Sequence, residues 1–220
     1  MGRVVARGRA GAYTGLPVWE NHVADHRRRH AHGRKSAPLE EAIGRRRVHS
    51  FTDTDTDASE TENLRLAEFI SPGVVKIALA GTDQWTVVEE LIDLLVEAGE
   101  VPEKLARASL RAAKEREAIR PTGWKYGLAL PNGRVKGLRR IVAAVGVSQG
   151  GVDFGCRDGL PARIVVLLLF PEARYARFAP AINDIADTLE DPALREAILT
   201  ARRGGDVVEA IEDAETRDFS

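Results

Sequence analysis

Residue types that can act as nucleophiles, proton carriers or metal ligands are distributed unevenly along this chain. The histidines, whose protonation changes nearest to neutral pH, all lie in the first fifty residues: His22, His26, His30, His32 and His49. Beyond them the chain has one cysteine, Cys156, and many arginines, whose planar donor groups suit phosphate or carboxylate oxygens. The chain after residue 50 is therefore better equipped to bind an anion than to perform imidazole chemistry.

The sequence predicts no metal site and no cofactor. His22, His26 and His30 recur every four residues and would share one face of a helix. Their segment is rich in glycine and arginine, however, and we attribute the spacing to composition. Nothing in the sequence indicates a lowered pKa for the Cys156 thiol, so we expect a small packed residue at that position.

The composition is that of a globular protein, with 44% hydrophobic and 30% charged residues in a chain of 220. The longest apolar run, from Ile164 to Phe170, is far shorter than the ~20 residues that a membrane helix needs, and it reads as a buried strand. No membrane insertion is expected. A single cysteine excludes an internal disulfide framework and favours a cytoplasmic location.

Residues 1–62 are predicted to be a disordered basic arm followed by a polar linker, because no apolar period persists there. Residues 1–50 carry a net charge of +7, whereas the rest of the chain carries −8. Three interpretations remain open for the arm. It is a weak binding segment for nucleic acid or another polyanion, a solvated tail, or an untranslated extension upstream of the true start codon. Met1 is the only methionine, so a later start would use another codon.

A folded domain is predicted over residues 63–214, with a short tail at 215–220. Short β-branched or apolar runs predict strands over residues 74–79, 126–130, 141–148 and 162–170. Apolar residues at helical spacing, with capping residues before them, predict helices over residues 82–98, 102–117 and 174–189, and from 192 and 206 onward. Residues 131–137 are predicted to be a connection. Helices interspersed with a few strands indicate an α/β domain in which a small mixed sheet is flanked by helices.

Several motifs in this domain agree in order and spacing with one known family. They are Leu-Leu-Val-Glu-Ala-Gly at 94–99, Lys-Glu-Arg-Glu at 114–117, Thr-Gly at 122–123, Pro-Asn-Gly-Arg at 131–134 and Gly-Val-Asp-Phe-Gly at 151–155. Together they resemble the type-2 IIA domain of the bacterial phosphotransferase system, the fructose, mannitol and nitrogen-regulatory class. The resemblance covers roughly residues 64–214 and implies the mannitol/fructose IIA-like fold.

The resemblance implies phosphoryl chemistry that this chain cannot perform in the usual way. In the family, a phosphocarrier protein donates a phosphoryl group to a histidine of the motif Pro-His-Gly/Ala-Arg, which passes it to a IIB domain. Asn132 occupies that histidine position here, and Tyr175 aligns with a second family histidine. The amide nitrogen of asparagine has its lone pair delocalised into the carbonyl, so it cannot replace the imidazole ring. We predict that histidine-type phosphotransfer has been lost.

The resemblance also places Arg116 at the family arginine that contacts the phosphoryl group, and Arg134 follows the active-site position. Retained anion binding is one interpretation of this pair. The alternative is that Arg116 forms a helix-end ion pair with a nearby glutamate and that Arg134 is simply solvated. Asn132 likewise has two interpretations, a turn residue that tolerates left-handed backbone and a specific hydrogen-bonding group.

The leading functional hypothesis is a degenerate IIA-like module that acts by regulation or protein binding, without enzymatic turnover. By family analogy its partner is a phosphocarrier protein, a IIB domain or transporter, a kinase or a regulator. Two alternatives stay open. One is a working phosphoryl carrier that uses an unanticipated nucleophile, and the other is a small-anion sensor built on Arg116 and Arg134.

Overall fold

The computed structural model describes residues 64–217; the predicted basic arm lies outside the described residues. One five-stranded mixed sheet forms the centre of the described domain. Its strands are β1 (Val75–Lys76), β2 (Leu128–Ala129), β3 (Asn132–Val135), β4 (Val142–Val152) and β5 (Ala162–Pro171). The order is β1-β4-β5-β2, and β3 also pairs with β5. β4 is antiparallel to β5, whereas the other pairings are parallel.

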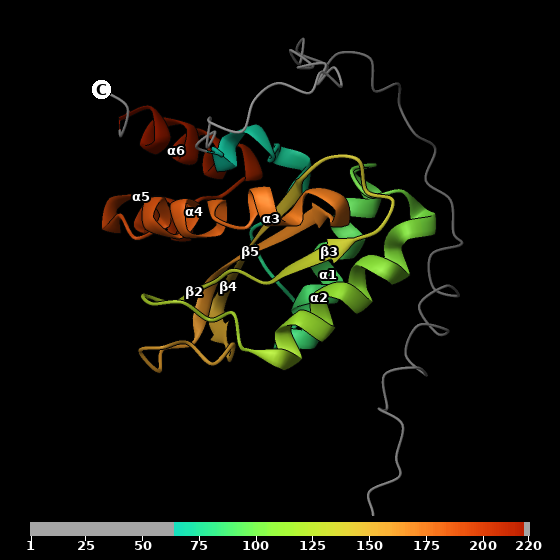
Figure 1. The fold of residues 1–220 in the computed structure, drawn as a ribbon. Helices are drawn as coiled ribbons and strands as arrows, with labels where there is room; N and C mark the ends of the chain where they lie inside the picture. Colours follow the sequence, from blue (N-terminus) through green and yellow to red (C-terminus); the bar gives the residue numbers. More distant parts are fainter. Residues whose placement is uncertain (1–63, 218–220) are drawn as a thin grey trace, which may run out of the picture. The chain divides into compact units, whose positions relative to one another are not determined.

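Helices cover both faces of this sheet (Figure 1), with α1 and α2 on one side and α4, α5 and α6 on the other. Their bounds are α1 (Gln84–Glu97), α2 (Ala106–Ile119), α3 (Tyr175–Phe178), α4 (Ala181–Leu189), α5 (Pro192–Thr200) and α6 (Gly204–Arg217). The predicted α/β class with a small mixed sheet is confirmed. Among residues 64–217, no helix has the length and apolar character needed to cross a membrane.

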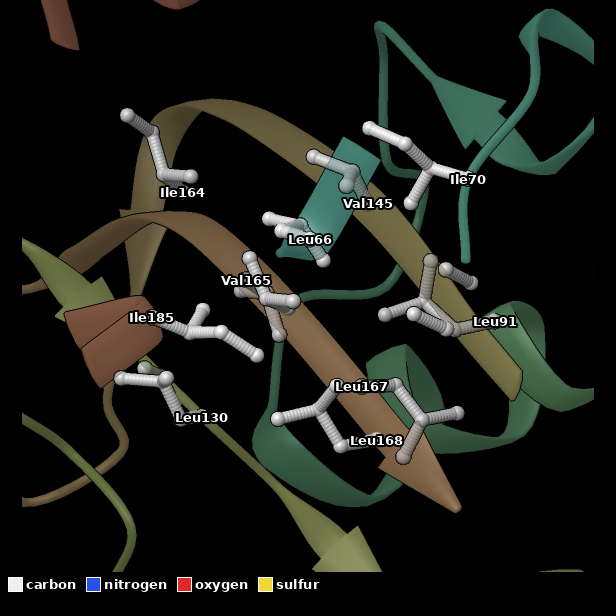
Figure 2. Close-up of a cluster of buried hydrophobic side chains, with 14 of the residues drawn as sticks. Leu66, Ile70, Leu91, Leu130, Val145, Ile164, Val165, Leu167, Leu168 and Ile185 are labelled. Carbon is white, nitrogen blue, oxygen red and sulfur yellow. The ribbon is translucent and has the colours of Figure 1, made fainter. Parts of the chain in front are cut away.

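β5 is the centre of the hydrophobic core, because it pairs with three other strands and has helices over both faces. Every residue from Ile164 to Phe170 is at most 1% exposed. Figure 2 shows side chains of β5 between Leu91 of α1 and Ile185 of α4. Burial on both faces explains why this strand reads in the sequence as a continuous apolar run rather than as an alternating one.

Three predicted elements are shorter than expected or divided in the structure. The strand predicted for residues 126–130 is reduced to β2. The strand predicted for residues 74–79 is reduced to β1, because the backbone that follows turns toward α1 and the N–H groups of Ala80 and Gly81 donate to the carboxylate of Glu90. The helix predicted for residues 174–189 is divided into α3 and α4, with Pro180 at the start of α4. Proline has no N–H to continue a helix and is better tolerated where one begins.

The connection predicted for residues 131–137 contains a strand, β3. It extends the sheet beside the second half of β5, with Asn132 opposite Leu168 and Arg134 opposite Phe170. The carbonyl oxygen of Pro131 accepts the N–H of Leu168 at 2.9 Å. The strand was missed because its four residues include glycine, arginine and asparagine, which carry no apolar alternation, and because its partner lies far along the chain.

The C-terminal helix runs further than the tail predicted for residues 215–220 allows. α6 continues to Arg217, and Glu215 within it is buried. The Glu215 carboxylate accepts the backbone N–H groups of Leu66 and Ala67 at 2.6 and 3.2 Å. Burial raises the pKa of Glu215 despite these donors. The helix therefore anchors the first described segment of the domain.

The start of α1 agrees with the prediction of a helix beginning at Thr82 or Asp83. Asp83 is the N-cap, and its Oδ1 accepts the N–H groups of Trp85 and Thr86 at 2.8 and 3.1 Å. The side chain of Thr86 completes a capping box by accepting the Asp83 N–H. Burial alone would raise the pKa of Asp83, but these hydrogen bonds outweigh it and hold the pKa below its usual value.

Replacing the cap tests this part of the fold. Asp83→Ala is expected to lower the free energy of unfolding by about 1 kcal/mol at neutral pH, because two N–H groups lose their acceptor. A depressed pKa means that Asp83 stabilises the fold above the pKa of the unfolded chain and loses this effect as pH falls through the folded pKa. The difference between the proteins in urea unfolding should therefore shrink in acid. The capping role would be contradicted if the difference in unfolding free energy between Asp83→Ala and the natural protein were the same in acid. An equally large loss of stability in Thr82→Ala would contradict it as well.

Candidate functional site

The four predicted site residues, Asn132, Tyr175, Arg116 and Arg134, line one surface pocket with a volume of about 160 Å³. They reach it from three elements: α2 supplies the arginine at 116, β3 supplies residues 132 and 134, and α3 begins at the tyrosine. The remaining lining residues are Ala112, Glu115, Ile119 and Gly133. Residues separated by almost sixty positions in the chain are thus brought together.

The pocket exists because β3 lies directly against α2 at Gly133. A Cβ atom at this glycine would lie 2.9 Å from the backbone nitrogen of Ala113 and 3.1 Å from the carbonyl carbon of Ala112. Real Cβ atoms do not approach backbone that closely, so only glycine fits here without a shift of the strand or the helix. Figure 1 shows β3 running beside α2. The close approach sets the residues on either side of the glycine next to the last turns of the helix.

Asn132 is buried at the base of this arrangement, with 3% of its surface exposed. Its Nδ2 donates to the carbonyl oxygen of Leu130 at 3.0 Å. Its Oδ1 is buried and has no hydrogen-bond partner among the described residues. A buried acceptor without a partner carries a free-energy cost of roughly 1–3 kcal/mol.

The interpretation of Asn132 as a turn residue with left-handed backbone is wrong. It lies in β3, and among the described residues only Tyr126 combines a side chain with a positive φ. The asparagine is therefore not explained by backbone geometry, which leaves the hydrogen-bonding interpretation of its side chain.

Arg134 is exposed to solvent, and its guanidinium lies over the ring of Tyr175. Its Cζ lies 4.3 Å from the centroid of the tyrosine ring, within the range of a cation–π contact. Tyr175 in turn packs edge-on against Phe170 of β5, with ring centroids 5.6 Å apart and an angle of 84° between the rings. Arg134 also lies opposite Phe170 in the sheet register, so these contacts place its guanidinium on the pocket wall beside the two rings.

Arg116 lies in the last turn of α2 and does not form the predicted ion pair with a glutamate. Its Nη1 donates to the carbonyl oxygen of Arg120 at 2.8 Å, and no carboxylate within residues 64–217 pairs with it. Cations near a helix C-terminus are stabilised by the exposed carbonyl groups there. The remaining donors of this guanidinium are available to the pocket.

The end of α2 is fixed by the buried carboxyl group of Glu117. Its Oε1 accepts the N–H of Thr122 at 3.0 Å, and its Oε2 accepts the Thr122 hydroxyl. Burial raises the pKa of Glu117, although the hydrogen bonds from Thr122 and the charge of Arg116 act in the opposite direction. This contact ties the loop after α2 to the helix, which keeps Arg116 and Ile119 in place.

Cys156 lies outside the pocket and is unsuited to nucleophilic chemistry. It is buried, and its thiol donates to the carbonyl oxygen of Leu128 at 3.4 Å. Burial, reinforced by the charges of Asp158 and Asp153, raises its pKa to about 11. A thiol with that pKa is almost entirely protonated at neutral pH. The expectation of a small packed residue is confirmed.

The sequence did not single out four residues that line the pocket: Glu115 and Ile119, and also Ala112 and Gly133. The first two could have been found from Arg116, because residues three and four apart share a helix face and Ala112, Glu115, Arg116 and Ile119 follow that spacing. The glycine had a weaker signal, since its role depends on a contact with a distant helix.

The chemistry available to this pocket follows from its side chains. It has two guanidinium groups, one carboxylate, one amide, one phenol and the aliphatic side chain of Ile119. No histidine occurs anywhere after His49. Arginine donors and an amide can bind and orient an oxyanion, whereas the phenol of Tyr175 and the carboxylate of Glu115 are the only groups in the pocket of types that act as nucleophiles.

Comparisons with known proteins identify related sequences over nearly the whole described domain. The family model of the phosphoenolpyruvate-dependent sugar phosphotransferase system, EIIA 2, matches residues 68–214. A nitrogen regulatory protein of Pseudomonas aeruginosa is 29% identical over 138 residues, which cover 63% of this chain and 88% of that protein.

The described domain also resembles solved structures. The nitrogen regulatory protein IIA-Ntr of Neisseria meningitidis superposes with a TM-score of 0.59 at 21% identity, covering 66% of this chain and 97% of that one. The enzyme IIAMTL of Escherichia coli, in its complex with phosphorylated enzyme IIBMTL, gives a TM-score of 0.54 at 18% identity over 66% and 97% of the two chains. At these identities the structural likeness shows the fold.

A methyl group at Gly133 tests the contact on which the pocket depends. Gly133→Ala is expected to lower the free energy of unfolding by about 1–3 kcal/mol, because β3 and α2 must move apart. The measurement is urea unfolding followed by circular dichroism. Gly205→Ala is the matched control, because a Cβ there meets nothing within 4 Å; we expect it to be neutral or stabilising by up to ~1 kcal/mol. Equal effects of the two changes would show that the close approach is not a constraint.

Proposed function

Since the chain belongs to the EIIA type 2 family of the phosphoenolpyruvate-dependent sugar phosphotransferase system, we propose that it is a member without a phospho-acceptor histidine. In this proposal it acts as a regulatory, protein-binding module. The observation that carries the proposal is that the domain contains no histidine, while its arginine-lined pocket contains Asn132. An amide cannot form the phosphoramidate that a histidine ring forms.

We assign Asn132 to the position of the family phospho-acceptor and Tyr175 to that of the second family histidine. Two features of the pocket support this assignment. Both residues line it, and Arg116 and Arg134 lie on the same walls, as a site derived from a phosphoryl-binding ancestor would require. In this assignment neither family histidine is present, so the phosphoryl acceptor and the histidine next to it are lost together. Two such replacements favour a change of role over random substitution at one position.

The proposed partner is another protein, most simply one that recognises the surface around this pocket. The related enzyme IIAMTL was solved in a complex with phosphorylated enzyme IIBMTL, so a type 2 IIA fold is suited to docking another protein. For this chain we propose a partner among phosphocarrier proteins, IIB or transporter domains, kinases and regulators, and a cytoplasmic location. Nucleic acid has no part in the proposed role of the domain.

The alternative within the family is a working phosphoryl carrier that uses another nucleophile. Cys156 is a poor candidate because it is buried and its pKa is raised to about 11. Tyr175 lines the pocket, but a tyrosine hydroxyl is a weak nucleophile without a neighbouring base. This alternative and the main proposal differ in one observable, a covalent phosphoryl adduct.

Intact mass spectrometry separates them directly. The full chain is incubated with phosphoenolpyruvate, enzyme I and the phosphocarrier protein, with the Asn132→His variant in parallel. We expect no phosphoryl adduct in the natural domain, because it lacks a competent acceptor, and partial labelling of the variant if the docking surface is retained. Adducts are mapped by fragmentation, because the histidines of residues 1–50 are also possible acceptors. A single adduct mapping to residues 64–217 of the natural protein would overturn the proposal.

Binding of a free small anion is a second candidate function, favoured by the two arginines that share the pocket. It requires inorganic phosphate to raise the melting temperature relative to chloride at equal ionic strength. For a chain of this length the shift is about 2–4 °C for each kcal/mol of binding free energy. Anion binding in this pocket also requires that the phosphate-induced rise in melting temperature be lost in Arg116→Ala. The rise should persist in Arg111→Ala, because Arg111 is an exposed residue of α2 outside the pocket. Equal shifts in both variants would discard the candidate.

A further inference from the structure

The formal charge of the pocket limits the anion that it can hold. Two guanidinium groups, Arg116 and Arg134, and one carboxylate, Glu115, give the lining residues a net charge of +1. A phosphoryl group carries about −1.5 to −2 charges at neutral pH, whereas a carboxylate carries −1. A carboxylate therefore neutralises the pocket, while a phosphoryl group would leave excess negative charge beside Glu115.

The two guanidinium groups are placed to receive such a carboxylate. Neither forms an ion pair within the described part of the chain, although Glu115 lines the same pocket. Arg134 stacks over the ring of Tyr175 at 4.3 Å, a contact that uses the flat face of the guanidinium and leaves its edge free to donate. Planar donors at a guanidinium edge match the two oxygens of a carboxylate.

The size of the pocket favours one side chain over a free metabolite. Its volume of about 160 Å³ is smaller than the roughly 300–1,000 Å³ of typical small-molecule sites. A partner polypeptide that inserts one side chain into the pocket also makes contacts outside the cavity. A free small carboxylate does not make these additional contacts.

The rim supplies that additional contact. Ile119, in the last turn of α2, lines the pocket and has 83% of its surface exposed. An exposed branched aliphatic residue beside a fixed Arg–Tyr pair has the composition of a protein-binding hot spot, in which aromatic and arginine anchors adjoin apolar contacts. The neighbouring surface of α2 carries further exposed cations, Arg107 and Arg111, which favours an acidic partner over a basic one.

We propose that this pocket receives the carboxylate of an aspartate or glutamate side chain of a partner polypeptide, with an apolar neighbour of that residue packed on Ile119. The inference rests on the proposed protein-binding function and names the chemistry of the partner. Arg116 and Arg134 hold the carboxylate, and Glu115 selects against anions of higher charge.

The test is a titration of the isotope-labelled full chain, followed by the NMR amide signals of Asn132, Gly133 and Arg134. The probes are acetyl-Leu-Glu-Leu-amide, acetyl-Leu-Gln-Leu-amide and inorganic phosphate. We expect the glutamate peptide to shift these signals and to bind at least about tenfold more tightly than either of the other probes, which corresponds to about 1.4 kcal/mol. Equal binding of the two peptides, or tighter binding of phosphate, would overturn the inference. Absence of any shift with the glutamate peptide at millimolar concentration would overturn it as well.

Substitutions of the charged pocket residues test whether the glutamate peptide occupies this pocket. Arg116→Gln and Arg134→Gln are expected to weaken binding of the glutamate peptide at least about tenfold. Arg202→Gln, at an exposed arginine outside both the pocket and α2, should leave the affinity for this peptide unchanged. Glu115→Gln raises the formal charge to +2 and should shift preference toward phosphate. If all three arginine variants bind equally, the peptide does not occupy this pocket.

The outcomes for this inference and for the proposed function are separable. A phosphoryl adduct on residues 64–217, with selective binding of the glutamate peptide intact, would overturn only the claim that phosphoryl transfer has been lost. Absence of an adduct together with equal binding of the two peptides would overturn only the carboxylate assignment.

Discussion

The contact between β3 and α2 at Gly133 is the constraint on which the site depends. The strand can lie against the helix backbone only because this position has no Cβ, and that approach brings Asn132 and Arg134 to the same pocket as Arg116. The sheet holds the other side of the strand, since β3 pairs with the part of β5 that is buried from Ile164 to Phe170. The candidate site therefore has both of its arginines on regular elements, Arg116 on α2 and Arg134 on β3, rather than on loops.

The side chains around this contact hold one another in position, and the exception is Asn132. Tyr175 packs on Phe170 and supports Arg134, while the buried carboxyl group of Glu117 fixes the end of α2. Among the residues that line the pocket, Asn132 alone has a buried side-chain atom, Oδ1, without a hydrogen-bond partner in the described part of the chain. A structural asparagine would be expected to satisfy both ends of its amide. The unsatisfied oxygen is consistent with a residue that replaced another in a site formed for a different group.

Local signals predicted much of this domain, and long-range contacts account for what they missed. Asp83 and the apolar spacing after it predicted α1, and the run from Ile164 to Phe170 predicted the central strand. β3 was read as a connection because its pairing with β5 is encoded at a distance of more than thirty residues. The site residues themselves were predicted through the family resemblance; their convergence in one pocket depends on packing between α2, β3 and α3, which residue spacing alone does not describe.

³¹P NMR distinguishes a pocket that binds without chemistry from one that accepts a phosphoryl group. The full chain is held with phosphoenolpyruvate, enzyme I and the phosphocarrier protein, and spectra are compared with and without it. The account predicts the same signals in both, those of phosphoenolpyruvate, inorganic phosphate and the phosphohistidine of the carrier. A new phosphoryl resonance that requires this chain, and persists when residues 1–50 carry no histidine, would contradict it.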